Sequence, residues 1–553
     1  MSSSVKAYEI MDRSEGNVSM ETYDVIVIGG GISGLVCANY LAREGRRVVL
    51  LEQNHRAGGC MSGFWRNGFY FDAGDQSFES LGIILPILKE IGVYDKHRWE
   101  RVRYRVKSPD LDFVITSLDD VESRFEEAFP DDEEGIKSFF WEAKRVSHFL
   151  SEFADPWHSP FTEKPNVGTL FRFLKWLPGL RRWMDPEFRG KLCRGIKREN
   201  LRNWFIGSGY QKMTFFVFAA FWHIWAHDYW YPVEGLQSLM DSLAEQATRH
   251  GGAVRFRTPV HKILIRDHRV VKGVVTGNGE EIGAEHIVYT GDYKRLVFSI
   301  LGEGYFEPGF LDEIRRSRLS EALVSVYIGL DIPPEELRSN MKTHHVFYFP
   351  NYDVLFPDAG SDGDIHSRMW IEITSPSLGG SGLSPSGKSS LILQTFSSSR
   401  WQDFWKNGTE EQRRKDEYRK FKMDVGMQMV RSAEEVIPGL TERISCMDVG
   451  TPLSYIRFTL NTDGASAGWT YDPSGSPLAR KFGYLRFRTP VKGLHTAGHY
   501  SMWPGGVPTA ALSGKIVANT ILGRFPFAQM ELLCKIFEAV KRGSSLTWSS
   551  PRV

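Results

Sequence analysis

The chain has 553 residues, of which 42% are hydrophobic and 24% are charged, and its formal net charge is +1. This composition is typical of a globular protein with a sizeable core, and the near-zero charge offers no global attraction to nucleic acid. The five cysteines are widely spaced and form no CxxC pair, which argues against a disulfide framework and a zinc site. We therefore expect a reducing compartment and no metal.

The first segment, residues 1–22, is polar and has no long apolar run after a basic start. It predicts neither a secretory signal nor an N-terminal anchor, and we expect a disordered tail. The expected location is intracellular, either cytoplasmic or peripheral to a membrane.

Residues 24–52 have the pattern of a dinucleotide-binding unit. An apolar, β-branched run over 24–28 predicts a buried parallel strand, and the sequence GGGISG follows it without a gap. A helix is expected over 32–44 and a second strand over 47–51. This order indicates a nucleotide cofactor, and a chance match of the glycine pattern is the alternative.

Each glycine of the motif has its own expected task. Gly29 permits the tight turn, Gly31 lets the backbone approach a pyrophosphate, and Gly34 lets the helix press on the sheet. The phosphates are expected at the helix N-terminus, beside Ile32 and Ser33, where free N–H groups point outward.

Glu52 closes the unit, near the spacing of about 20 residues at which a carboxylate accepts the ribose hydroxyls of the adenosine half. A phosphate on that ribose would be repelled, so NADP is disfavoured.

The continuation separates FAD from NAD, because residues 52–62 read E-x(3)-R-x-GG-x(2)-S and Phe71-Asp72-Ala73-Gly74 follows. The pattern resembles the flavoprotein group that includes amine oxidases, protoporphyrinogen oxidase, phytoene desaturases, carotenoid isomerases and retinol saturases. The resemblance implies FAD, with a positive charge from Arg56 at the pyrophosphate and further contacts from Gln53, Gly58, Gly59, Met61 and Ser62. The alternative is a glycine-rich loop with a solvated arginine.

A basic amphipathic stretch follows in the middle of the chain. Residues 168–184 form a helical stripe of apolar side chains, which Pro178-Gly179 is expected to break into two pieces. Over 172–202 ten basic residues stand against three acidic ones, a balance of +7. With Trp176 and Trp183 this stretch suits an interfacial membrane helix, and a core-packed helix with a solvated basic face fits equally well.

Residues 213–226 are apolar and uncharged, but shorter than the roughly 20 residues that a spanning helix requires. They predict a buried helix that lines an apolar tunnel, or one that belongs to the ordinary core.

Residues 382–389, GLSPSGKS, match the phosphate-loop pattern letter for letter. A phosphate loop must lead into a helix, whereas residues 390–396 read as a strand, and Pro385 removes one donor of the cradle. We therefore reject nucleotide hydrolysis. The stretch resembles a hairpin of retinol saturases and carotenoid isomerases, and 450–454 and 463–468 resemble family signatures on the substrate side of the flavin, or are two turns.

The chain end predicts the rest of the flavin site. A strand ends at Gly498, and Pro508 suits the first turn of a helix to about residue 522. Residues 503–515 are similar to the PGxGVPxAxxSG ending of phytoene desaturases and carotenoid isomerases, with one glycine fewer. This resemblance implies flavin contacts from Gly498, Gly506 and Val507, and an adenine contact from Val260.

The expected fold class is α/β, a Rossmann-type FAD-binding domain with an inserted α+β substrate domain. The expected division is a tail (1–22), FAD-binding parts (23–105, 231–300 and 485–525), a substrate- or membrane-facing insertion (106–230), a substrate domain (301–484), and a C-terminal helix and tail (526–553).

The resemblance implies an FAD-dependent oxidoreductase that desaturates, saturates or isomerises a carbon–carbon double bond of a long apolar polyene or isoprenoid, such as a carotenoid or retinoid. The alternatives are an amine-oxidase-like enzyme with a smaller substrate and a non-catalytic prenyl-lipid escort. Without a second nucleotide motif, electrons would pass to or from oxygen, a quinone or a reduced carrier.

Asp75 and His499 are the expected catalytic side chains, since both titrate and both follow segments placed beside the flavin by the resemblance. Asp75 could hold or deliver a proton, and His499 could polarise the flavin or a terminal substrate hydroxyl. The alternative is structural, with Asp75 accepting backbone N–H bonds and His499 capping a strand.

Overall fold

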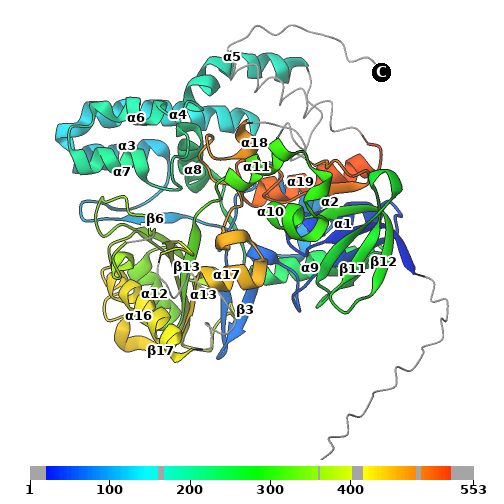
Figure 1. The fold of residues 1–553 in the computed structure, drawn as a ribbon. Coiled ribbons are helices and arrows are strands. Elements are labelled where there is room, and N and C mark those ends of the chain that lie inside the picture. Colours follow the sequence, from blue (N-terminus) through cyan, green and yellow to red (C-terminus); the bar gives the residue numbers. More distant parts are fainter. Residues whose placement is uncertain (1–19, 160–166, 359–360, 402–414, 481–486, 525–553) are drawn as a thin grey trace, which may run out of the picture.

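The computed structural model describes residues 20–159, 167–358, 361–401, 415–480 and 487–524. Two large sheets and a helical lobe make up this part of the chain (Figure 1). The expected tail over 1–19 and the expected C-terminal helix over 526–553 lie outside the described residues.

The first sheet carries the dinucleotide unit. Its strand order is β10-β11-β12-β1-β2-β9, and β18 pairs with β12. Strands β9, β2, β1, β12 and β18 run parallel, whereas β10 and β11 form an antiparallel edge. The strands are β1 (Glu21–Ile28), β2 (Val48–Leu51), β9 (Ala253–Arg255), β10 (Val260–Arg266), β11 (Val270–Thr276), β12 (Glu281–Tyr289) and β18 (Leu494–Thr496).

The first strand corrects the predicted tail. β1 begins at Glu21, three residues before the predicted strand, because Glu21 and Thr22 already pair with Ile282 and Gly283 of β12. Residues 21–22 are therefore part of the sheet.

Three helices, α1 (Ile32–Arg43), α9 (Leu236–Arg249) and α19 (Val507–Ile521), pack together beside this sheet (Figure 1). A Cβ on Gly514 would lie 2.2 Å from the carbonyl oxygen of Ser33, so α1 and α19 approach this closely only at glycine. The buried Asn39 donates to the carbonyls of Leu35 and Leu243, each at 2.9 Å, and links α1 to α9. This packing buries α1 along most of its length.

The second sheet has the order β17-β13-β16-β15-β14-β6-β7 and is antiparallel except for the pair β14 and β6. Apolar side chains of one face pack on α12 (Pro334–Met341) and α16 (Asp416–Ala433). The strands are β6 (Tyr104–Lys107), β7 (Asp112–Val114), β13 (Ala322–Leu330), β14 (His345–Tyr348), β15 (Ile371–Thr374), β16 (Ser389–Ser397) and β17 (Ile444–Gly450).

The rejection of a phosphate loop is confirmed, since the residues that follow the motif form strand β16 and no helix. A phosphate cradle needs helix N–H groups at that point, and a strand supplies none.

The helical lobe comprises α3 (Leu118–Ala128), α4 (Glu133–Phe153), α5 (Val167–Trp183), α6 (Phe188–Leu192), α7 (Glu199–Gly207) and α8 (Phe215–His227) (Figure 1). The predicted break at Pro178-Gly179 is wrong, because α5 runs through both residues. Proline removes one N–H from the helix, but the indoles of Trp176 and Trp183 anchor both sides of it to α4.

Smaller elements connect these parts. They are β3 (Gly63–Arg66), β4 (Phe69–Asp72), α2 (Ile84–Ile91), β5 (Trp99–Arg101), β8 (Trp230–Pro232), α10 (Tyr293–Arg295), α11 (Pro308–Arg316), α13 (Pro376–Gly379), α17 (Pro452–Thr459) and α18 (Pro477–Arg480). Within the described ranges, no helix combines the length and the apolar character needed to cross a bilayer.

Candidate functional site

One cavity of about 1690 Å³ extends from the glycine loop, past the second sheet, to the helical lobe. Pockets for a single drug-sized ligand measure about 300–1,000 Å³, so this cavity has room for more than one group. Its far end is aromatic, with walls from α4, α5, α8 and the second sheet that include Phe149, Phe153, Phe173, Phe216, Phe221, Trp222, Trp225, Phe347 and Trp370.

The glycine loop forms the near end of the cavity. Gly29 has a φ of +108°, a conformation in which other residues are strained, and a Cβ on Gly34 would lie 2.0 Å from the Gly29 carbonyl oxygen. At Gly31, by contrast, a Cβ would meet no protein atom within 4 Å. The glycine at 31 therefore keeps space open on the cavity side and is not required by the fold.

Helix α1 begins directly behind this opening. Its N-cap, Gly31, supplies no side-chain hydrogen bond, and Ile32 and Ser33 of the first turn line the cavity. The uncapped N–H groups and the helix dipole favour an anion there.

The Glu52 carboxylate is fixed at the edge of the same opening. One oxygen accepts the N–H of Gly30 at 2.6 Å, and the other accepts the N–H of Asn54 at 2.8 Å. Each oxygen keeps a lone pair, so this buried carboxylate can accept hydrogen bonds from two hydroxyl groups. Gln53 also borders the cavity, and its amide donates to the carbonyl of Phe458 at 3.1 Å.

The second glycine pair meets the first loop. The N–H of Gly58 donates to the Gly30 carbonyl at 2.8 Å, and Gly58, Gly59 and Met61 line the cavity. Arg56 does not border it, because its guanidinium donates to the carbonyl of Gly63 and to His55. Gly34 and Ser62 are likewise absent from the cavity wall.

The C-terminal segment closes the site from the other side. Val260, Gly498, Gly506 and Val507 all line the cavity. Gly506 is the N-cap of α19, with a φ of +137° and no side-chain cap, so a second helix N-terminus opens here. The dipole of this helix favours negative charge on a bound group.

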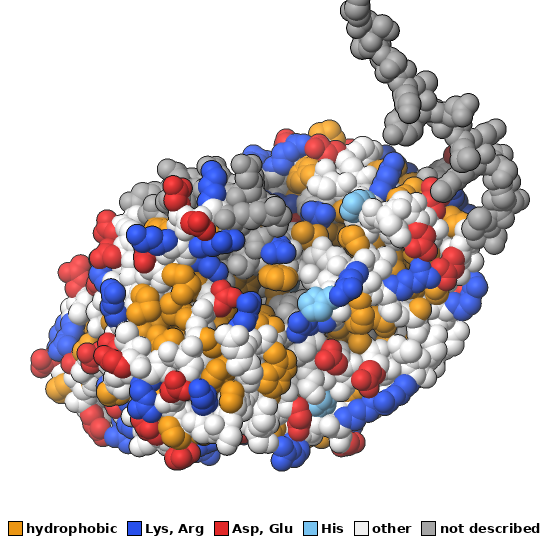
Figure 2. Space-filling model, turned by 90° about the horizontal axis from the view of Figure 1, so that it is seen from below, with side chains coloured by type: hydrophobic (Ala, Val, Ile, Leu, Met, Phe, Trp, Pro, Cys, Tyr) orange, Lys and Arg blue, Asp and Glu red, His pale blue; other side chains and the backbone are white. Residues whose placement is uncertain are grey.

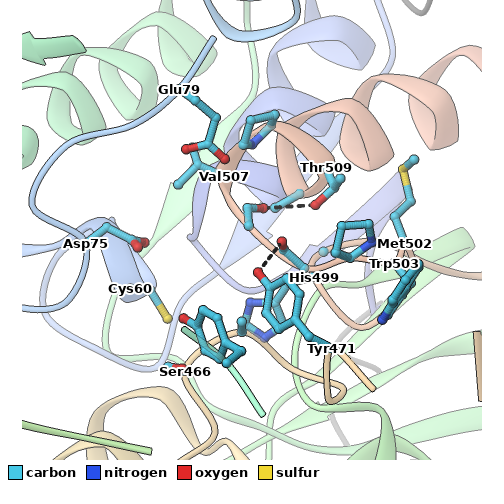
Figure 3. A pocket seen from close by; sticks show the side chains of 18 of the residues that line it. Cys60, Asp75, Glu79, Ser466, Tyr471, His499, Met502, Trp503, Val507 and Thr509 are labelled. Atoms are coloured by element: carbon cyan, nitrogen blue, oxygen red, sulfur yellow. Dashed lines mark hydrogen bonds between the residues drawn. The ribbon is translucent and has the colours of Figure 1, made fainter. Parts of the chain in front are cut away.

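Carboxyl groups of Asp75, Glu79 and Glu372 face the cavity, and Figure 3 shows Asp75 and Glu79 at its wall. Burial raises the pKa of Asp75 to about 7, with a contribution from Asp72. Burial also raises the pKa of Glu79 to about 8 and that of Glu372 to about 7, although the Tyr104 hydroxyl donates to Glu372 at 3.0 Å. These groups can hold a proton near neutral pH.

The two expected catalytic residues thus border one cavity. The Asp75 carboxylate accepts no hydrogen bond within the described residues, while its backbone N–H donates to the Cys60 carbonyl at 2.9 Å. Burial lowers the pKa of His499 to about 4, although Asp292 opposes this shift, so the imidazole is neutral at physiological pH.

The sequence reasoning missed Glu79 and Glu372. Glu79 lies four residues after Asp75 on the same irregular segment, so its nearness in sequence to Asp75 was the available signal. Glu372 alternates with Ile371 and Ile373 on β15, and only the pairing of the second sheet shows that this face meets the cavity.

The outer helix of the lobe decides between the two alternatives that the sequence left open for Trp176 and Trp183. Trp176 and Trp183 are buried, and their indoles donate to Glu152 and Glu142, each at 2.8 Å. Both tryptophans therefore belong to the core. Among the side chains of α5 that the structure describes, Phe171 and Leu174 are large, apolar and exposed, by 67% and 36%.

The surface carries both basic and acidic side chains. Figure 2 shows basic and acidic side chains interspersed over one face of the molecule. Among the described residues, no cluster of three or more His, Cys, Asp or Glu side chains could hold a metal ion.

The family model for flavin-containing amine oxidoreductases matches residues 32–522, and the chain belongs to this family. The predicted resemblance and the predicted α/β fold class, with a Rossmann-type sheet and an antiparallel sheet, are confirmed. The open helix N-termini, Glu52 and the space at Gly31 fit the flavin nucleotide that the family name implies.

The chain is similar in sequence to individual proteins of known activity and in fold to solved structures. It is 25% identical to the all-trans-retinol 13,14-reductase of Danio rerio, over 90% of this chain and 86% of that protein. It is 26% identical to the chloroplastic prolycopene isomerase of Arabidopsis thaliana, over 94% and 86%. Putrescine oxidase bound to putrescine has the same fold, with a TM-score of 0.58 and 14% identity, over 91% of this chain and 99% of that one.

Proposed function

We propose that the protein is an FAD-dependent oxidoreductase that acts on a carbon–carbon double bond of a long apolar polyene or isoprenoid, of the carotenoid or retinoid class. The observation that carries this proposal is the single cavity, which joins a nucleotide-binding glycine loop to an aromatic chamber. A polyene is long, flat and apolar, and such a chamber buries it without leaving polar groups unpaired.

The residues that would hold FAD follow from the geometry. Glu52 would accept the ribose hydroxyls, the N-terminus of α1 the pyrophosphate, and the N-terminus of α19 the ring system. Bound flavin supplies hydride exchange with a carbon of the substrate.

The remaining chemistry belongs to the chain's own side chains. The aromatic walls would exclude water, and the dipole of α19 would stabilise negative charge on a ring bound at its N-terminus. Asp75, Glu79 and Glu372 are the groups that would give or take the proton that accompanies each hydride, because burial raises the pKa of each.

An amine-oxidase-like reaction on a smaller substrate is the competing proposal. Tyr210 and Tyr471 line the cavity as an aromatic pair, but their rings stack at 4.3 Å between centroids. The rings thus fill the space between them and leave no slot for an amine, which favours the polyene.

We also propose that the protein binds membrane surfaces through α5. Phe171 and Leu174 are exposed next to Phe173, which lines the cavity, so an apolar substrate could pass from a bilayer into the chamber. Surrounding lysine and arginine side chains would attract anionic headgroups.

The visible spectrum of the purified protein, with chromatography of the released cofactor, tests the first part of the proposal. The expected result is stoichiometric FAD. Protein without flavin would leave the prenyl-lipid escort as the better explanation. Rapid anaerobic bleaching of the flavin by putrescine or cyclohexylamine, with no effect of polyenes, would favour the amine oxidase.

A further inference from the structure

A row of polar side chains crosses the protein from its surface to the cavity wall. The Glu100 carboxylate, on β5, has a side chain that is 38% exposed and lies 3.8 Å from Nε2 of His344. Nδ1 of His344 lies 3.2 Å from Nδ1 of His345, and Nε2 of His345 lies 3.0 Å from the Ser77 hydroxyl, which borders the cavity. The row thus spans the distance from solvent to the site, with hydrogen-bond contacts at its two inner links and a gap of 3.8 Å between Glu100 and His344.

The two histidines are unusual as core residues. His344 and His345 are only 4% and 2% exposed, and Nε2 of His344 is buried without a hydrogen-bond partner in the described part of the chain. An unpaired buried polar atom costs free energy, and apolar side chains would fill the same space without that cost. The nearest acid to this unpaired atom is Glu100, at the surface end.

We infer that Glu100, His344, His345 and Ser77 form a relay that carries protons between solvent and the cavity. The inference rests on the proposed function for the use of the proton, because saturation of a double bond takes one proton with each hydride and desaturation releases one.

The steps balance without any other reactant. Glu100 gives a proton to Nε2 of His344. The His344 ring then releases a different proton, the one on its Nδ1, to Nδ1 of His345. His345 passes its Nε2 proton to Ser77, and Ser77 gives its own hydroxyl proton to a group in the cavity. One proton enters and both imidazoles end neutral with exchanged tautomers, which reset when the proton flow reverses or the rings turn over.

The surroundings keep both rings neutral between transfers. Burial lowers the pKa of His344 to about 4, with help from Arg338, and that of His345 well below its usual value, with help from His344. Burial raises the pKa of Glu100, against the effect of Arg338, so this carboxyl holds a proton more readily than a solvated one.

Tyr104 links the inner end of the relay to Glu372, because its hydroxyl interacts with the side chain of Ser77 as well as with Glu372. The Tyr104 ring packs on His345 at 4.9 Å between centroids, and the Tyr104 hydroxyl donates to Glu372 in the cavity wall. The raised pKa of Glu372, about 7, leaves this carboxyl protonated in mildly acidic buffer. Its proton can therefore be followed directly.

The test is hydrogen–deuterium exchange at Glu372, followed by the infrared carbonyl band of its protonated carboxyl in flavin-loaded protein after a switch to D₂O. Glu372→Gln assigns the band. We expect exchange to slow about tenfold or more in His345→Phe and in Glu100→Gln. Glu100→Gln changes only the surface end, so it stays informative if His345→Phe folds poorly.

His366→Phe is the matched control, since His366 is also buried but lies outside the relay. The rate of exchange at Glu372 in this variant should equal the rate in the parent protein. Equal exchange in the parent, His345→Phe and Glu100→Gln would overturn the relay. The measurement needs no polyene, so a failure to find polyene chemistry would refute the proposed function without touching this result.

Discussion

Gly31 and Gly34 belong to the same motif, but the geometry predicts opposite consequences for their replacement. A side chain at Gly31 would point into open cavity space, since no protein atom lies within 4 Å of its Cβ, and the φ of −75° is allowed for any residue. Gly31→Val should therefore fold like the parent protein and lose its cofactor. Gly34→Ala should damage the fold itself.

The expected magnitudes follow from the contacts. At Gly34 the new Cβ would lie 2.0 Å from the Gly29 carbonyl oxygen, so backbone must shift, and overpacking of this kind costs about 1–3 kcal/mol. At Gly31 the cost to folding should stay below about 1 kcal/mol. The valine methyls would occupy the space through which the pyrophosphate approaches. We therefore expect FAD affinity to fall at least a hundredfold, which corresponds to about 2.7 kcal/mol of binding free energy.

Thermal unfolding of the cofactor-free proteins and titration of each with FAD separate the two effects. Glu52→Arg serves as a second variant that should lose the cofactor. It removes the carboxylate, held by the N–H of Gly30, that we expect to accept the ribose hydroxyls. Stoichiometric FAD in both Gly31→Val and Glu52→Arg would refute the assignment of the site.

Three further predictions concern the acids and the surface. Asp75→Asn keeps the shape of a group that accepts no hydrogen bond within the described residues, and it should lower turnover about a hundredfold with FAD binding unchanged; parent-like turnover would make Asp75 a turn residue only. Burial raises the pKa of Asp72 from 3.8 to about 7, so its contribution to stability is complete below 3.8 and is lost as pH rises through 7. Denaturant unfolding compared between acid and alkaline pH should show a loss of stability that is smaller in Asp72→Asn than in the parent by an amount on the order of 4 kcal/mol, and an equal loss in the two proteins would contradict the assignment. Flotation of the parent protein with anionic liposomes should weaken in salt, and it should also fall when four exposed basic residues of the segment 172–202 become glutamate, namely Arg181, Arg182, Lys197 and Arg198. Unchanged binding would remove the segment 172–202 from the interface.

The parts of the site that were predictable depend on local backbone geometry. The tight turn at Gly29 and the close helix contact at Gly34 each require glycine, and the approach of a pyrophosphate requires it at Gly31, so the three glycines together predicted the loop. Glu52 was predictable for the same reason, since the length of one helix and one strand sets its distance from the glycines.

The missed residues depend on pairing between distant strands. Glu372 reaches the cavity because β15 lies in the second sheet with that face inward, and His345 lies beside Tyr104 through the parallel pairing of β14 with β6. Local pattern carries no information on such pairings. The sequence left two alternatives for Trp176 and Trp183, membrane anchors or core residues, for a similar reason: only the packing of α5 on α4 shows that Glu152 and Glu142 accept from their indoles.

The most direct measurement is product analysis after anaerobic incubation of the flavin-loaded protein, oxidised and reduced, with a panel of carotenoids and retinoids. Chromatography and absorption spectra count the double bonds of each polyene and determine their geometry. We expect that at least one polyene gains, loses or isomerises a double bond, and that the same polyene stays unchanged with Gly31→Val. A panel that remains unaltered in both redox states, with flavin fully bound, would contradict the proposed function.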